Sequence, residues 1–83
     1  MSMKLEMLRV FRTVAETGTL AAAARELNRT PSAISMTLAQ LADEIGAPLF
    51  ETDRKNRLTP LGQLVLEESC RATDVFDKSA QAI

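Results

Sequence analysis

The chain has 83 residues, which is enough for one small domain with a modest hydrophobic core. Its 46% hydrophobic content is too high for a disordered tail, and it contains no apolar run near the roughly 18 residues that a membrane span needs. A single cysteine excludes an internal disulfide, and the absence of histidine removes the commonest metal ligand and general base. We therefore expect a non-enzymatic, cytoplasmic protein with no membrane segment, no metal and no other cofactor.

The charges are distributed unevenly along the chain. The net charge of −1 by itself argues against a nucleic-acid binder. However, residues 1–58 carry eight basic and seven acidic residues, whereas residues 59–83 carry two basic and four acidic ones. Three of the basic residues crowd into 53-DRKNR-57. The acidic excess therefore belongs to the C-terminal part, and the rest of the chain can still face a polyanion.

The first two predicted elements are helices over residues 4–17 and 20–28. In the first, apolar residues recur at helical spacing, namely Met7, Val10, Phe11 and Val14. Gly18 stands where a left-handed C-terminal cap is expected, and Thr19 can cap the second helix. Four consecutive alanines make that second helix thin. We therefore expect a neighbouring helix to cross it closely.

A third helix is predicted over about residues 31–45. Thr30 is a good N-cap and Pro31 suits the first helical position, where its missing N–H is no loss. One side forms an apolar stripe of Ile34, Leu38, Leu41 and Ile45. At about 100° per residue, the opposite side holds Ser32, Met36, Ala39 and Asp43, flanked by Ser35 and Gln40. From Pro31 to Leu41 this helix has neither a positive charge nor an aromatic ring.

The remainder of the chain predicts a small hairpin and then a long helix. The hairpin has arms at 49–52 and 57–59 around a polar turn. Thr59 and Pro60 repeat the cap-plus-proline pattern, and Gly62 near the start of the helix costs about 1 kcal/mol relative to alanine. At about 1.5 Å per residue, a helix over 60–83 spans roughly 36 Å, which is longer than so small a domain can cover. The stripe predicted to be uncovered consists of Leu61, Val65, Ala72, Phe76 and Ile83.

This order of elements indicates a helix-turn-helix motif, in which the second helix enters the major groove of DNA. Small outward residues suit this role because they let the helix backbone lie deep in the groove. The side chains expected to face bases are Ser32, Ser35, Met36 and Gln40. Phosphates are expected to be held by Arg29 and Thr30 at the start of the helix, and by the hairpin cations Arg54, Lys55 and Arg57.

Each of these signals also has a plainer interpretation. A polar helix face or a cationic turn is usually just solvated, and a long amphipathic helix is more often a member of a bundle than a dimerisation arm. The chain could also be a winged-helix domain that has lost DNA binding and docks a protein partner, and the weak net charge favours that alternative slightly. A salt titration of the affinity for duplex DNA separates the two hypotheses.

From about Leu5 to Val65 the chain resembles the N-terminal domain of LysR-type transcriptional regulators. The segments that carry the resemblance are 11-FRTVAETGTLAAAARELN-28, 30-TPSAIS-35, 41-LADEIGAPLF-50 and 57-RLTPLG-62. The resemblance implies a mainly α-helical winged helix-turn-helix over 1–59, with three helices and a two-stranded wing over 50–58. It also implies a linker helix over 60–83 that packs antiparallel in a homodimer. In this bacterial family an effector-binding domain and higher oligomers are features of the full-length protein, so the chain is expected to be a DNA-binding fragment.

Carried over residue by residue, the resemblance assigns the start of the recognition helix to Thr30, Pro31, Ser32, Ser35 and Met36. It assigns the wing tip to Arg54 and Lys55, and the return strand to Arg57. Many family members have Gln-Pro or Gln-Ser in place of Pro31-Ser32, Arg or Lys near Ala39 and Gln40, and Arg in place of Thr52. The chain is therefore expected to bind a DNA site with two-fold-related half-sites, more weakly alone than many relatives and with more dependence on its dimer helix.

Overall fold

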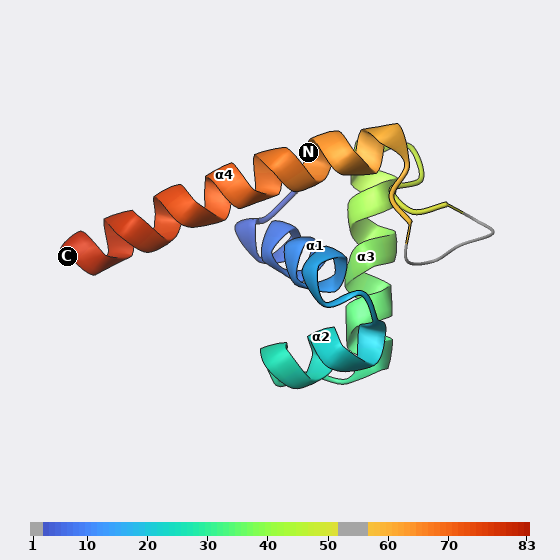
Figure 1. The fold of residues 1–83 in the computed structure, drawn as a ribbon, viewed down its shortest axis with the longest axis horizontal. Helices are drawn as coiled ribbons and strands as arrows, with labels where there is room; N and C mark the ends of the chain where they lie inside the picture. The colour runs from blue at the N-terminus through green and yellow to red at the C-terminus, as the bar shows by residue number, and fades with distance from the viewer. Residues whose placement is uncertain (1–2, 52–56) are drawn as a thin grey trace.

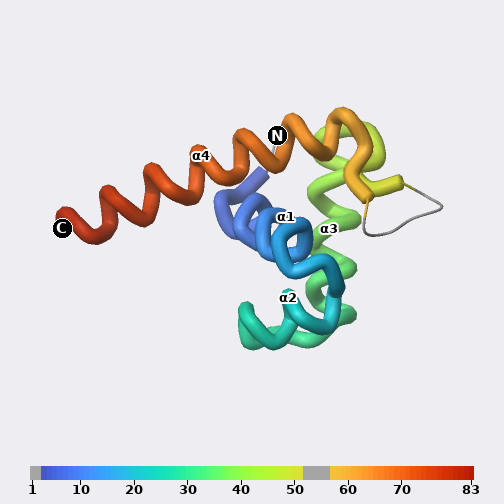
Figure 2. Tube along the Cα trace, viewed as in Figure 1, coloured from blue at the N-terminus to red at the C-terminus, as the bar shows by residue number. Residues whose placement is uncertain are grey.

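The computed structural model describes residues 3–51 and 57–83, and within these ranges it consists of four helices joined by short connections (Figure 1). The helices are α1 (Leu5–Thr17), α2 (Leu20–Leu27), α3 (Pro31–Ile45) and α4 (Pro60–Ala82). All four were predicted, with boundaries that agree to within one residue. α1, α2 and α3 gather on one side, and α4 runs across α1 so that its C-terminal end extends beyond the other helices (Figures 1 and 2).

Threonine caps begin three of the helices, as the sequence predicts. The hydroxyl oxygens of Thr19, Thr30 and Thr59 accept hydrogen bonds from the backbone N–H three residues further on, at 3.0, 3.1 and 2.9 Å. Each cap satisfies one of the backbone donors that the first turn of a helix leaves free. The boundaries of α2, α3 and α4 are therefore fixed by local chemistry that can be read from the sequence.

The turn between α2 and α3 is three residues long and is closed by backbone hydrogen bonds. Asn28 adopts the left-handed conformation with φ of 59°, which asparagine tolerates better than most residues. The Arg29 N–H then donates to the Ala24 carbonyl at 2.8 Å, in the manner of a Schellman cap. The pair of helices forms the predicted helix-turn-helix.

The core consists of two groups of buried side chains that share α1 as a wall. One group brings Val10 and Val14 of α1 against alanines of α2 and against Ile34 of α3, which confirms that the thin α2 is closely packed. The other group contains Phe11, Leu41 and Leu49. The predicted apolar faces of α1 and α3 are therefore the buried faces. This packing turns the opposite side of α3 outward.

The predicted two-stranded wing is only partly visible. Phe50 and Leu58 form an isolated antiparallel bridge, the Glu51 N–H donates to the Arg57 carbonyl at 2.8 Å, and the Thr59 N–H donates to the Leu49 carbonyl at 3.0 Å. This pairing brings the two predicted arms together at their base. It is too short to count as a strand, and none is assigned within 3–51 and 57–83. The wing-tip residues Arg54 and Lys55 lie outside the described residues.

α4 is fastened to α1 by small buried side chains and by ion pairs. Ser69 and Thr73 are completely buried, and the Arg12 guanidinium donates to the Thr73 hydroxyl at 2.7 Å and to the Asp74 carboxylate at 2.9 Å. Arg9 pairs with Asp77 at 2.9 Å. The hydrogen bond to Asp74, and to a smaller extent the one to Glu16, raises the pKa of Arg12 above its ordinary value, so this side chain stays charged. These contacts fix the direction in which α4 leaves the domain.

The apolar stripe predicted on α4 is divided between two environments. Leu61 and Val65 pack against the buried group around Phe11, so the prediction that the whole stripe is uncovered is wrong for this first part. The domain body lies beside the start of α4 and covers it. Further along, Phe76 is 53% exposed and Ile83 is fully exposed. No helix within the described ranges combines the length and the apolar character that crossing a membrane would require.

Candidate nucleic-acid interface

The outward face of α3 is built as the sequence predicts. Because Ile34 and Leu41 are fully buried, the residues on the other side of the helix face solvent. These exposed residues are Pro31, Ser32, Ser35, Met36, Ala39, Gln40 and Asp43. All the predicted base-facing residues are therefore brought together on one accessible surface, which we call the α3 face.

The α3 face is uncharged over most of its length. α3 contains no lysine or arginine, and its first acidic residue is Asp43 near the C-terminal end. The N-terminal end of a helix carries a partial positive charge and unpaired backbone N–H groups, which favour an anion there. Cationic contacts to a polyanion would have to come from outside α3. Arg57, which follows the undescribed segment, is exposed and available for such a contact.

Two predicted phosphate contacts at the start of α3 already have partners within the chain. The Thr30 hydroxyl oxygen accepts from the Ala33 N–H, which leaves its own O–H free to donate. The guanidinium of Arg29 is paired with the Glu6 carboxylate of α1. A phosphate would have to compete with Glu6 for Arg29. No local pattern in the sequence indicates this pair, because residues 6 and 29 come together only when α1 packs beside the turn.

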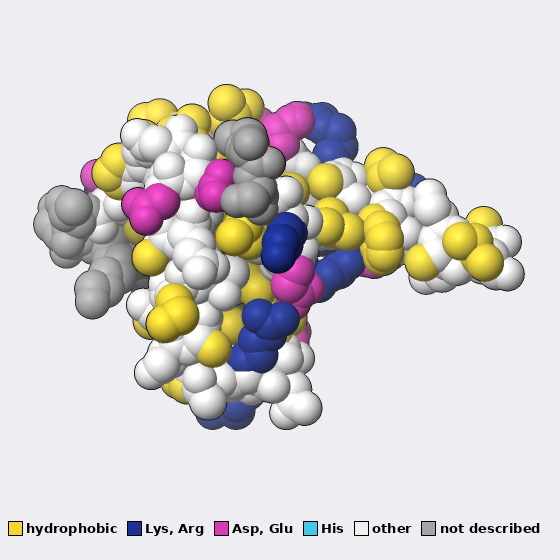
Figure 3. All heavy atoms as spheres, turned by 180° about the vertical axis from the view of Figure 1, so that it is seen from behind, with side chains coloured by type: hydrophobic (Ala, Val, Ile, Leu, Met, Phe, Trp, Pro, Cys, Tyr) yellow, Lys and Arg dark blue, Asp and Glu magenta, His cyan; other side chains and the backbone are white. Residues whose placement is uncertain are grey.

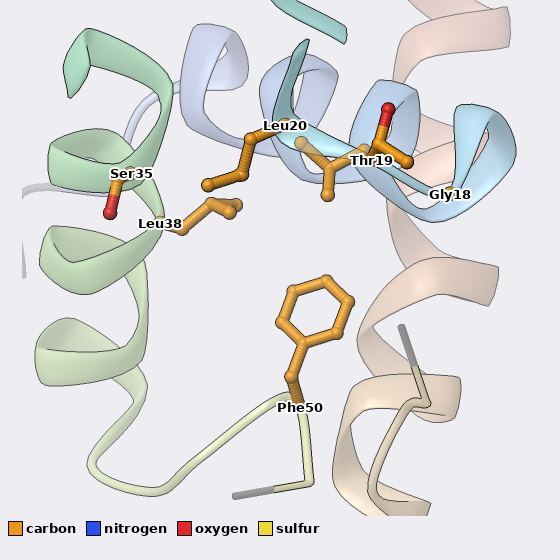
Figure 4. A pocket seen from close by; sticks show the side chains of 7 residues that line it. Gly18, Thr19, Leu20, Ser35, Leu38 and Phe50 are labelled. Atoms are coloured by element: carbon orange, nitrogen blue, oxygen red, sulfur yellow. The ribbon is translucent and has the colours of Figure 1, made fainter. Parts of the chain in front are cut away.

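An open hollow of about 620 Å³ lies next to α3. Leu20 and Leu38 point toward one another at one side of it and the Phe50 ring faces them from the other, with Ser35 at its α3 edge (Figure 4). None of the described residues that line the hollow is titratable. Cys70 is a free, half-buried residue of α4. The hollow therefore offers a mainly apolar surface beside α3.

A second accessible surface runs along α4. Its exposed large hydrophobic side chains are Leu64, Val75, Phe76 and Ile83, and hydrophobic groups are visible along this helix toward its free end (Figure 3). At about 100° per residue, these four residues fall within an arc of roughly 120°, which also contains Ala72. Leu64 and Val75 were missed by the sequence reasoning. A wider search of the i, i+3 and i+4 positions would have found them.

Comparisons with known proteins agree with this arrangement of helices. A profile described as "Bacterial regulatory helix-turn-helix protein, lysR family" matches residues 5–63. The chain is 39% identical over 80 residues to the HTH-type transcriptional activator CmpR of Synechocystis, which covers 95% of this chain and 26% of CmpR. It is 36% identical over 78 residues to the probable HTH-type transcriptional regulator YhaJ of Escherichia coli, which covers 93% of this chain and 26% of YhaJ. The chain spans about a quarter of the length of these curated relatives.

Solved structures of similar fold also include DNA-binding domains of transcriptional regulators. The CbnR DNA-binding domain in its complex with DNA has 30% sequence identity and a TM-score of 0.86, with 96% of this chain and 93% of that chain covered. The BenM DNA-binding domain in its complex with benA site 1 DNA has 25% identity and a TM-score of 0.89, with 96% and 94% covered. The chain therefore belongs to the lysR family of bacterial regulatory helix-turn-helix proteins, and it has the fold and extent of that family's DNA-binding domain.

Proposed function

We propose that this domain binds double-stranded DNA sequence-specifically, with α3 in the major groove. The observation that carries the proposal is the α3 face, which is accessible, uncharged up to Asp43 and composed mainly of small side chains. Such a face lets the helix backbone approach base edges closely. The similarity to DNA-binding domains whose structures were solved with DNA supports the same assignment.

In the proposed interface, one set of residues contacts bases and another set contacts phosphates. Ser32, Ser35, Met36 and Gln40 face base edges, because they lie on the exposed side of α3. Phosphates are held by Thr30 at the start of α3, by Arg29 after it leaves Glu6, and by a wing that carries Arg54, Lys55 and Arg57. Pro31 lies beside Thr30 at the first position of α3. The paired base of this wing, at Phe50 and Leu58, supports the placement of the cations beside α3. Cationic contacts supply affinity, and base contacts supply specificity.

The proposed active form is a homodimer on two-fold-related half-sites. Leu64, Val75 and Phe76 of α4, with Ile83 directly after it, form an apolar surface that none of the described residues covers. Packing two copies of this surface antiparallel would bury it and place two α3 helices on one side of the dimer. Ala72 lies in the same arc, whereas Leu61 and Val65 contribute mainly to the domain's own core.

The experiment that tests the proposal is a salt titration of DNA affinity with a sample shown to be dimeric. Fluorescence anisotropy is measured with duplexes selected from a random pool and with shuffled duplexes of the same composition. We expect the affinity for both to fall steeply with salt, because phosphate contacts release counterions. The selected duplexes should bind more tightly at every salt concentration. Failure of the dimer to bind any duplex at about 50 mM salt would overturn the proposal.

A further inference from the structure

One exposed hydrophobic side chain is not explained by dimerisation. Within residues 3–51 and 57–83, five large hydrophobic residues are exposed; three of them lie on α4, and Ile83 directly follows it. The fifth is Met36, which is 66% exposed in the first half of α3. A large apolar side chain left in water costs free energy that burial would recover. Met36 lies on α3 and not on the α4 surface, so the proposed contact between two copies of α4 would not bury it.

The neighbours of Met36 make it the most prominent group on its surface. On a helix the adjacent positions are three and four residues away, and here these include Ser32, Ala39 and Gln40. Ser32 and Ala39 are too short to shield Met36, and Gln40 is polar. The thioether side chain has three rotatable bonds and adapts to the shape of what it meets. It is thus an isolated apolar group in a polar surface, which is too small a patch for docking a folded protein.

The chemistry of the major groove identifies one base that suits this group. Thymine is the base that presents a methyl group there, while guanine presents two acceptors that arginine or lysine reads best. α3 has no arginine or lysine with which to read guanine in that way. We propose that Met36 determines specificity by packing against the 5-methyl group of a thymine in each half-site. This inference rests on the proposed function, since it requires α3 to lie in the major groove.

The test removes the methyl group without changing base pairing. Sites selected by the wild-type dimer are resynthesised with each thymine replaced in turn by deoxyuridine, and the affinity is measured. In each half-site, replacing one particular thymine should lower the affinity of the dimer for the duplex about fourfold. This is the ratio expected for burial of one methyl group. A selected site in which no replacement weakens binding would overturn the inference.

A variant at residue 36 assigns the effect to this side chain. Met36→Ala should bind the thymine and deoxyuridine duplexes equally, whereas Met36→Leu should retain a preference for thymine. Because Met36 is exposed, both variants should melt within a few degrees of the wild type. If Met36→Ala keeps the full preference, another residue reads the methyl group and the inference is wrong. If the wild-type dimer binds no duplex at all, the proposed function fails and this inference fails with it. Normal binding without methyl discrimination overturns the inference alone.

Discussion

Gly62 of α4 lies directly against the backbone carbonyl of Leu49, so that a Cβ atom at residue 62 would stand only 2.0 Å from the Leu49 oxygen. The glycine that weakens the start of α4 by its helix propensity is therefore required by the fold. It allows α4 to begin immediately above the segment that leads into the Phe50–Leu58 bridge. The absence of a side chain at this one position allows α4 to pack closely against the segment around Leu49.

Replacing Gly62 should destabilise the protein. By helix propensity alone, Gly62→Ala would stabilise α4 by about 1 kcal/mol. The clash with a backbone oxygen should outweigh this gain, so that the net free energy of unfolding falls by about 1–3 kcal/mol. Urea denaturation shows whether the free energy of unfolding falls or rises. The matched control is Ser79→Ala at an exposed position of α4, which should change stability by less than about 0.5 kcal/mol. A more stable Gly62→Ala variant would contradict the close approach.

Removing Arg12 should loosen the attachment of α4 to α1. Arg12→Ala loses the hydrogen bonds to Thr73 and Asp74, and we expect the free energy of unfolding to fall by about 1 kcal/mol. The matched control is Arg71→Ala, because the Arg71–Glu68 pair lies within α4 and does not join two helices. A double-mutant cycle of Arg12→Ala with Asp74→Ala should show coupling between the two residues. Additive effects in this cycle would show that the pair contributes nothing.

A charge at Phe76 should break the proposed dimer. Phe76 is 53% exposed on the apolar surface of α4, so Phe76→Glu would place a carboxylate in the proposed contact between two copies. Sedimentation velocity should show a monomer. Gln81→Glu adds the same charge to an exposed position that lies about 140° around the helix, and this variant should remain a dimer. An intact Phe76→Glu dimer would show that a different surface associates.

Removing Arg54, a cation of the predicted wing, should weaken DNA binding without changing sequence preference. Arg54→Ala should lower the affinity about equally for selected and shuffled duplexes, and should reduce the slope of the salt dependence by about 1. Lys78→Ala removes an equal charge from an exposed position of α4 and serves as the control, with little expected change. A loss confined to one DNA sequence would instead mean that Arg54 contacts a base.

The sequence by itself determined the helices and the accessible surface of the domain. Threonine caps, the prolines that follow two of them and Asn28 act over three or four residues, so the boundaries of the helices could be read locally. The periodicity of α3 separated its buried stripe from its exposed face for the same reason. The exposed face of α3 therefore lies at the predicted positions, while the DNA contacts of this face stay a prediction.

Only the tertiary structure decided which part of α4 packs against the rest of the domain and which part stays exposed. Leu61 and Phe76 look equivalent in the periodic pattern, but the first packs against the core and the second is half exposed. The pairing of Arg12 with Asp74 and of Arg29 with Glu6 joins residues that are distant in sequence. Such contacts depend on the angle at which helices cross. The close approach of Gly62 to Leu49 helps to set this angle for α4, and no local pattern in the sequence reveals it.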